Sequence, residues 1–125
     1  MTAGSFLADT QIILWSIKDD PRLGEEHRAV LASDATVYAS AASVWEIAIK
    51  RSIGKLDIPD DLPALLPRMQ FQPLTITFQH AHVVGRLPRH HGDPFDRLLI
   101  AQAQVENLTI LTADKQFALY DVALA

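Results

Sequence analysis

Short apolar segments that suit buried strands alternate with helical segments along this chain, and this alternation restricts the fold more than any other feature. The expected strands cover residues 5–8, 36–40, 73–77 and 108–112. Because helical segments separate them, these strands run parallel, and helices must cover both faces of the sheet. The sequence therefore predicts a three-layer α/β/α fold with a central parallel sheet.

The helical segments are recognised by their apolar spacing and by their start signals. Pro21 suits the first turn of a helix, and Asp93 followed by Pro94 is a strong N-terminal signal. Helices are expected at residues 10–18, 21–32, 41–51, 60–70, 78–87 and 93–106, with a short turn or helix at 114–117. A last edge strand is expected at residues 118–124.

Length and composition fit a single globular domain, residues 1–125. Hydrophobic residues make up 49% and charged residues 21%, and 125 residues can bury a sizeable core. The absence of cysteine excludes disulfides and thiolate metal sites. No basic segment precedes an apolar stretch near the start, and no apolar run approaches the length of a membrane span. The expected location is the cytoplasm, without a membrane partner.

Acidic residues lie close to the ends of the predicted strands. Asp9 and Asp114 each come just after a strand, and Glu46 lies in the first turns of the helix that follows another. Asp96 lies in the first turn of the helix before the last main strand. Ligand sites in open parallel sheets lie beyond the carboxyl ends of the strands. All four acids are therefore expected to meet at one rim of the sheet.

Two of these acids begin apolar helix stripes. Ile12–Ile13 follow Asp9 at helical spacing, and Leu99–Ile100 follow Asp96. Residues three and four apart share a helix face, so both carboxylates point toward the core, where a charge needs a counter-ion. No Lys or Arg has the matching spacing, and clustered carboxylates repel each other unless a divalent ion neutralises them. Oxygen ligands favour Mg²⁺ or Mn²⁺ over Zn²⁺.

Each acid also has a simpler structural explanation. Asp9 would suit the N-cap of its helix, and Asp96 could complete a capping box with Asp93. Glu46 could pair with the lysine one turn later, and Asp114 could start a turn. The arrangement of all four at one rim favours a metal site, but the single roles remain open.

Four segments, in their order along the chain, resemble the sequence blocks of PIN-domain nucleases of the VapC-type toxin branch. They are FLADTQIILW, SAASVWEIAIK, HHGDPFDRLLIAQA and LTILTADKQF. The resemblance runs from about residue 6 to residue 117. It implies a PIN-like fold and a metal-dependent endoribonuclease that acts as the toxin of a type II toxin–antitoxin pair. It further implies Mg²⁺ or Mn²⁺ as cofactor, RNA as substrate, a cognate antitoxin as partner, and a homodimer.

The resemblance also implies roles for individual residues. The positions that match the family's catalytic acids are Asp9, Glu46, Asp96 and Asp114. Asp9, Asp96 and Asp114 would be the metal ligands, the last one directly or through water. Glu46 would either bind a second metal or orient the attacking water.

Neighbouring residues would support these acids. Ser43, one turn before Glu46, would hydrogen-bond Glu46 or Asp9, and a solvated helix serine is the alternative. Asp93 would support the metal ligands, serve as an alternative ligand or, as the favoured role, cap its helix. Gln11 departs from the resemblance, because this branch often has His after the Asp-Thr pair.

The charge distribution bears on RNA binding. The chain has 15 acidic and 11 basic side chains, a net charge of −4, which is a poor match for nucleic acid. Four acids in a metal site would account for this whole imbalance. Arg86, Arg89 and Arg97, with His90 and His91 between them, are then the candidates to contact the RNA backbone. A solvated basic loop is the alternative, and residues 50–55 hold a second basic group.

Aromatic and histidine residues suggest other sites that are less favoured. Trp15, Trp45 and Phe95 have helical spacing among apolar neighbours and are expected in the core, not as stacking platforms for bases. A zinc site at residues 90–93 is disfavoured because adjacent loop histidines rarely point the same way.

Two other functions remain open. A phosphoacceptor or phosphatase domain is also a small α/β sheet with aspartates at strand ends, but Glu46 would then be idle. A catalytically silent PIN-like interaction module would not need all four acids.

Overall fold

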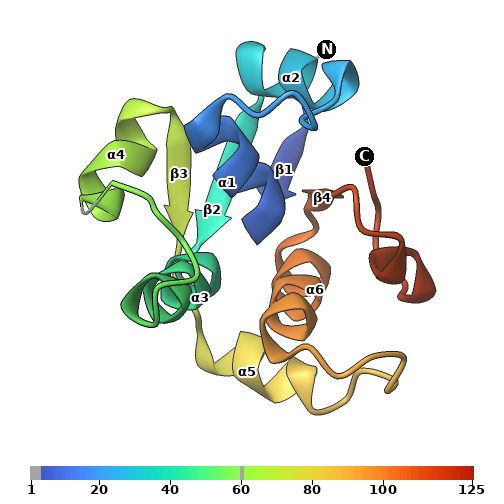
Figure 1. Cartoon of the computed structure of the whole chain (residues 1–125). Coiled ribbons are helices and arrows are strands. Elements are labelled where there is room, and N and C mark those ends of the chain that lie inside the picture. The colour runs from blue at the N-terminus through green and yellow to red at the C-terminus, as the bar shows by residue number, and fades with distance from the viewer. Residues whose placement is uncertain (1–3, 60) are drawn as a thin grey trace.

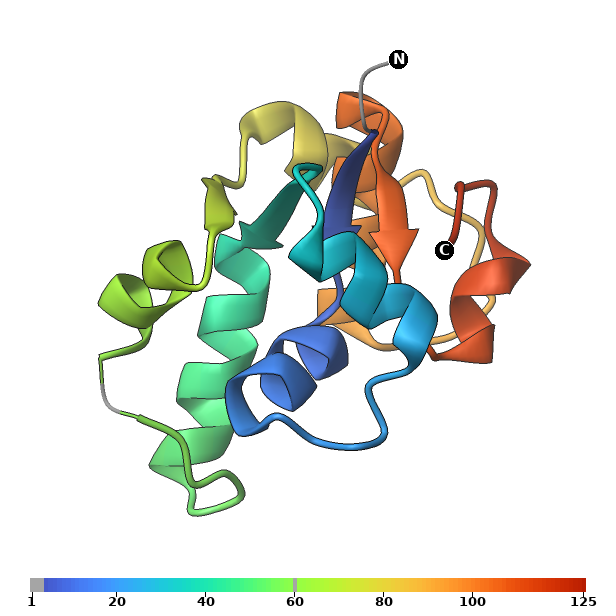
Figure 2. The same ribbon diagram turned by 90° about the horizontal axis from the view of Figure 1, so that it is seen from above.

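The computed structural model describes residues 4–59 and 61–125, and a parallel sheet lies at its centre (Figure 1). Its strands are β1 (Ser5–Ala8), β2 (Thr36–Ser40), β3 (Phe71–Leu74) and β4 (Thr109–Leu111). Their spatial order is β3-β2-β1-β4, which Figure 2 shows from left to right. Leu7 of β1 pairs with Tyr38 on one side and Ile110 on the other, and all the pairings are parallel. The predicted parallel sheet is confirmed.

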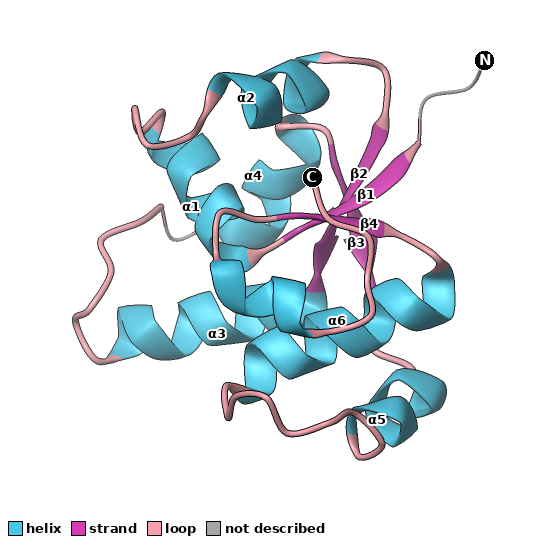
Figure 3. Cartoon of the chain, turned by 90° about the vertical axis from the view of Figure 1, so that its right-hand side faces the viewer, coloured by secondary structure: helices cyan, strands magenta, loops and turns pink. Residues whose placement is uncertain are grey.

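The helices pack on both faces of the sheet (Figure 3). They are α1 (Thr10–Lys18), α2 (Glu25–Ala32), α3 (Ala41–Ser52), α4 (Leu62–Arg68), α5 (Phe78–Val84), α6 (Pro94–Glu106) and the 3-10 helix η1 (Lys115–Leu119). One apolar core lies under α1, α2 and α4, and a second lies under α5, α6 and η1. Helix α3 adds Ile47 to the first core and Ala42 to the second. The predicted three-layer architecture is confirmed. No helix in residues 4–59 and 61–125 has the length and apolar character to cross a membrane.

Some predicted boundaries were wrong. Helix α2 begins at Glu25 and not at Pro21, because Leu23 and Arg22 instead turn back on Asp20 through their backbone nitrogens. Strand β3 begins at Phe71, two residues before the predicted start. Its proline is tolerated because β3 is an edge strand. The start predicted for the α4 helix, residue 60, lies outside the described residues.

The predicted edge strand at residues 118–124 was also wrong. Helix η1 runs to Leu119, and only Leu124 then forms a single parallel bridge with Ile110. Phe117 and Tyr120 are both buried against the second core, and residues three apart reach the same side only when the chain turns helically. The C-terminal segment thus lies along the free edge of β4.

Candidate active site

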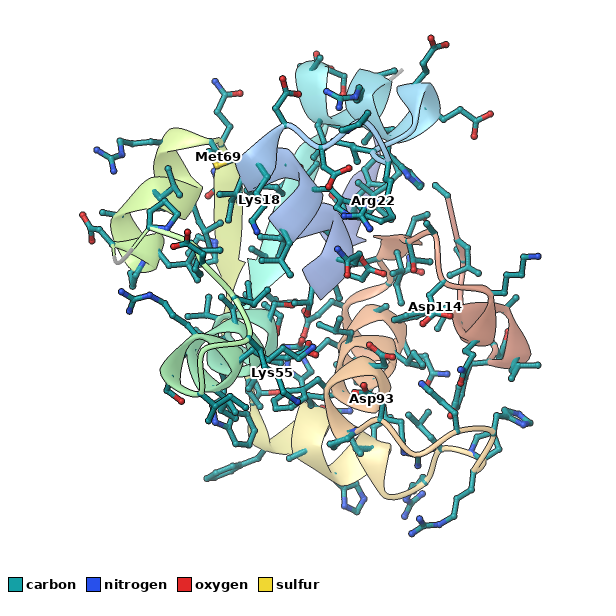
Figure 4. The ribbon with its side chains drawn as sticks, in the orientation of Figure 1. Lys18, Arg22, Lys55, Met69, Asp93 and Asp114 are labelled. Carbon is teal, nitrogen blue, oxygen red and sulfur yellow. The ribbon has the colours of Figure 1, made fainter. Side chains whose placement is uncertain are left out.

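A cleft of about 340 Å³ lies at the carboxyl rim of the sheet, and the predicted acids line it. We call it the acidic cleft and define it by Asp9, Glu46, Asp93, Asp96 and Asp114. These residues come from the start of α1, the middle of α3, the start of α6 and the segment between β4 and η1. Figure 4 labels two of them, Asp93 at the start of α6 and Asp114 beside η1. The structure thus brings together the four acids that the sequence placed at one rim.

Asp9 has two roles in the fold. Its extended backbone makes it the N-cap of α1, and its Oδ1 accepts from the backbone nitrogen of Ile12 at 2.8 Å. Its Oδ2 accepts a short hydrogen bond from the Thr112 hydroxyl. The residue is only 4% exposed, and this burial raises the pKa of the Asp9 carboxyl, although the bonds from Thr112 and Ile12 offset part of the effect. The predicted N-cap is confirmed.

Asp93 and Asp96 stand together at the start of α6. Asp93 Oδ1 caps the helix by accepting from the backbone nitrogens of Phe95 and Asp96 at 2.9 and 3.0 Å. Asp96 Oδ2 lies 3.3 Å from Nε2 of His91. Burial, with repulsion from Asp93 and Glu46, raises the pKa of Asp96 to about 6, against a lowering by His91. Lys50 lines the same cleft, but its printed ion pair is with Glu46 and not with Asp96.

Glu46 is buried with one oxygen unpaired. Its Oε2 accepts from Nζ of Lys50 at 2.9 Å, which confirms the pairing with the lysine one turn later. Its Oε1 is buried and has no hydrogen-bond partner. A buried carboxylate oxygen without a partner is costly, so it marks a place where a water or a cation belongs.

Thr112 connects two of the acids, and it was not among the site residues predicted from the sequence. Its hydroxyl donates to Asp9, and its Oγ1 accepts from the backbone nitrogen of Asp114 at 3.0 Å. Asp114 is exposed and caps η1, its Oδ1 accepting from the backbone nitrogen of Gln116 at 2.9 Å. The available signal was a threonine at the end of a strand, two residues before an aspartate.

The donor set fits a hard divalent cation in chemistry, although the acids are spread around the cleft. In the part of the chain that the structure describes, no three acidic or histidine side chains are close enough to enclose an ion as they stand. The donors are all oxygens, which suits Mg²⁺ or Mn²⁺. Lys50 pairs with one oxygen of Glu46, but the unpaired Glu46 Oε1 and the raised pKa values of Asp9 and Asp96 indicate that the negative charge of this cleft is compensated only in part.

A model of the PIN domain matches residues 6–123 of the sequence, which is nearly the whole chain. The chain belongs to the PIN-domain family. The predicted family and the PIN-like fold are therefore confirmed. No curated protein sequence matches this PIN domain significantly.

Solved structures share the fold. VapBC2 from Rickettsia felis, crystallised with a DNA fragment from its promoter, gives a TM-score of 0.74 at 19% identity over 97% of both chains. FitAcB from Neisseria gonorrhoeae gives 0.65 at 24% identity over 95% of both chains. A toxin–antitoxin complex from Klebsiella pneumoniae gives 0.63 at 20% identity, over 94% of this chain and 91% of that chain.

Arg97 does not lie where an RNA-contacting residue would. It is buried, and its Nη1 donates to Pro88 O at 2.8 Å and to the Tyr120 hydroxyl at 3.1 Å. Its Nη2 donates to the carbonyls of Val84 and Leu87 at 3.2 and 3.3 Å. With its donors engaged inside the PIN domain, the predicted RNA contact of Arg97 was wrong. Its partners come from distant segments, so the spacing could not reveal them.

The other basic and polar candidates divide. Arg86 and Arg89 are exposed after α5, as a backbone contact requires. Ser43 is buried and accepts from the Thr10 hydroxyl at 2.9 Å, so the predicted hydrogen bond to Glu46 or Asp9 was wrong. The packing of α1 against α3 brings these two hydroxyls together, and they satisfy each other instead of a carboxylate.

The aromatic residues that were expected in the core differ in their placement. Trp45 is 57% exposed and is not in either core. Its ring meets Phe95 edge-on, with 5.0 Å between centroids. Trp15 does pack partly against the first core, and the Arg22 guanidinium lies 5.5 Å from its ring centroid. Helical spacing alone did not distinguish an apolar stripe that is buried from one that is exposed.

Proposed function

We propose that residues 1–125, acting as one domain, form a metal-dependent endoribonuclease that is the toxin of a toxin–antitoxin pair. The observation that carries the proposal is the acidic cleft, where five carboxylates, two of them buried, line one hollow together with Lys50. Protein interiors do not gather unpaired carboxylates without a compensating partner, and at a cleft the usual one is a divalent ion. Membership of the PIN-domain family supports a nuclease.

The residues of the cleft would divide the work. Asp9, Asp96 and Asp114 would hold Mg²⁺, or Mn²⁺ in its place. Such an ion lowers the pKa of a bound water and stabilises charge on a phosphate under attack. Thr112 keeps Asp9 in place through its hydroxyl, and Glu46 offers its unpaired Oε1 to a second ion or to the attacking water.

The proposed substrate is unpaired RNA. An accessible phosphate of a single strand can enter a small cleft. Exposed Arg86 and Arg89 would attract the phosphate backbone, and Lys50 stands in the wall of the cleft. The phosphatase alternative is weaker, because Glu46 faces the same cleft as the aspartates.

The proposed protein partners are an antitoxin and a second copy of the chain. The solved relative from Klebsiella pneumoniae is a toxin–antitoxin complex. In this chain, Trp45 and Ile49 on α3 and Ile53 at its C-cap are spaced four apart and are 57%, 40% and 60% exposed. An apolar helix stripe of this kind is typical of a protein contact.

A cleavage assay tests the nuclease proposal. The wild type should cut single-stranded RNA oligonucleotides with Mg²⁺ or Mn²⁺ and lose this activity in EDTA. Asp96→Asn, which keeps the shape and removes the charge, should reduce the cleavage rate by at least about 100-fold. Asp34→Asn, at an exposed acid outside the cleft, is the matched control and should cleave as the wild type does. Equal rates with and without EDTA, or an active Asp96→Asn variant, would contradict the proposal.

Toxicity in bacteria is the second measurement. Expression of the wild type alone should arrest growth, and expression of Asp96→Asn should be tolerated at the same protein level. Equal toxicity would exclude metal-dependent cleavage as the cause.

A further inference from the structure

The buried guanidinium of Arg97 fixes the loop between α5 and α6. Its hydrogen bonds to the carbonyls of Leu87 and Pro88 hold this loop, and its bond to Tyr120 joins it to the segment after η1. Tyr120 is only 6% exposed and packs in the second core. The Tyr120 hydroxyl is thus held at a defined position beside His91.

The Tyr120 hydroxyl determines which nitrogen of His91 carries the proton. A phenol oxygen has one proton and two acceptor sites. The oxygen accepts from Arg97 Nη1 at 3.1 Å and from the backbone nitrogen of His91 at 3.3 Å. Its single proton is therefore directed to His91 Nδ1, which lies 2.8 Å away. With Nδ1 accepting, the proton of a neutral His91 ring sits on Nε2.

The Nε2–H of His91 is directed at Asp96, one of the acids that define the acidic cleft. It lies 3.3 Å from Asp96 Oδ2, and it is the one hydrogen-bond partner of the Asp96 carboxylate within the described part of the chain. The His91 side chain is 10% exposed and that of Asp96 18%, so solvent competes little for this contact. No donor from residues 4–59 or 61–125 bonds Asp96 Oδ1.

We infer that His91 is a positioning residue for Asp96. It holds Oδ2 by donation from Nε2 and so turns Oδ1 toward the cleft as the oxygen that binds the metal. This inference rests on the proposed function only in that Asp96 must be a metal ligand. Hydrogen-bond partners behind a metal ligand commonly change metal affinity by about 10–100-fold when they are removed.

Two substitutions of His91 separate positioning from packing. His91→Leu fills the space without a donor, and His91→Gln returns an N–H near the position of Nε2. Mn²⁺ affinity, measured by titration calorimetry, should fall by about 10–100-fold in His91→Leu and by much less in His91→Gln. His90→Leu is the matched control, since His90 also packs edge-on against Tyr120, at 4.9 Å between centroids, but does not bond Asp96. It should bind Mn²⁺ as the wild type does.

The melting temperature of each variant in EDTA accompanies the titration. Wild-type Mn²⁺ affinity in His91→Leu overturns the inference. The inference is also overturned if both His91→Leu and His91→Gln lose the same Mn²⁺ affinity and both have a lower melting temperature. In that case His91 would only fill space. Should His91→Leu fail to fold, Tyr120→Phe decides: loss of Mn²⁺ affinity supports the inference, and unchanged affinity overturns it.

Mn²⁺ binding and RNA cleavage by the wild type distinguish a failure of this inference from a failure of the proposed function. If the wild type binds Mn²⁺ but cuts no RNA, the nuclease proposal fails, and the His91 variants still support or overturn the positioning role through Mn²⁺ affinity. If the wild type binds no Mn²⁺, both fail.

Discussion

Asp96→Asn should stabilise the metal-free protein at neutral pH. The pKa of Asp96 rises from 3.8 to about 6 on folding, because burial and neighbouring acids disfavour its charge. The folded state therefore holds this proton more tightly than the unfolded state, and the stability contributed by Asp96 falls as the pH rises from about 4 to about 6. Above about pH 6 the ionised Asp96 carboxylate lowers the free energy of unfolding by a constant amount.

The magnitude follows from the size of the shift. A change from 3.8 to about 6 corresponds to about 3 kcal/mol once Asp96 is ionised in both states. Two effects reduce this value: solvent screens the charge of a side chain that is 18% exposed, and the helix dipole in the first turn of α6 favours an acid by about 0.5 kcal/mol. We therefore expect Asp96→Asn to gain about 1–2 kcal/mol at pH 7.5, which is roughly 3–8 °C in melting temperature.

Thermal and urea denaturation in EDTA measure this gain. Asparagine keeps an oxygen that can accept from His91, so the comparison removes the charge and little else. The gain should be present at pH 7.5 and mostly lost at pH 4. The exposed control Asp34→Asn should change stability by less than about 0.5 kcal/mol at either pH. With Mn²⁺ added, the order should reverse, because only the wild type gains stability from bound metal.

Two results would refute this reasoning. If Asp96→Asn is less stable than the wild type in EDTA at pH 7.5, the cleft does not carry uncompensated charge. If its gain is the same at pH 4 and pH 7.5, the gain does not come from ionisation.

Three further predictions concern residues outside the carboxylates. Arg97→Ala should lower the free energy of unfolding by about 2–4 kcal/mol, since it leaves buried acceptors unpaired, while exposed Arg86→Ala should change it by less than about 0.5 kcal/mol; urea unfolding measures both. Replacing both Arg86 and Arg89 by Ala should weaken RNA binding. The slope of log affinity against log salt concentration should fall by about 0.7 for each phosphate that the protein no longer neutralises. An unchanged slope would show that the RNA binds elsewhere on the protein. Ile53→Glu should abolish self-association or antitoxin binding, measured by light scattering after gel filtration. The melting temperature should not fall, because Ile53 is 60% exposed. A variant that still associates would exclude the stripe of Trp45, Ile49 and Ile53 as the contact.

Much of the fold could be predicted because its signals are local. Strand β1 and helix α1 have the predicted bounds, since a buried strand is apolar throughout and the Asp9 N-cap gives a sharp helix start. Strand β2 and the start of α6 were found for the same reasons. The positions of the acids follow from these elements, because parallel strands deliver their following residues to one rim.

Boundaries were less predictable where competing local bonds exist. Pro21 can start a helix, but Asp20 instead draws the backbone nitrogens of Arg22 and Leu23 into a turn, so α2 begins later. The segment after η1 has strand-like composition, yet the burial of Tyr120 in the second core turns the chain away from a strand. In both segments two local conformations, a helix or a turn in one and a strand or a helical turn in the other, have similar free energies, and tertiary contacts decide between them.

The sequence by itself determined the order of strands and helices, the PIN-like fold and the gathering of acids at one rim. Only the tertiary structure decided that Arg97 is an internal anchor, that Trp45 is exposed, and that His91 reaches Asp96. The physical reason is that burial and hydrogen bonding depend on what other segments place nearby. Arg97 looks like any surface arginine until the carbonyls after α5 and the Tyr120 hydroxyl close around it.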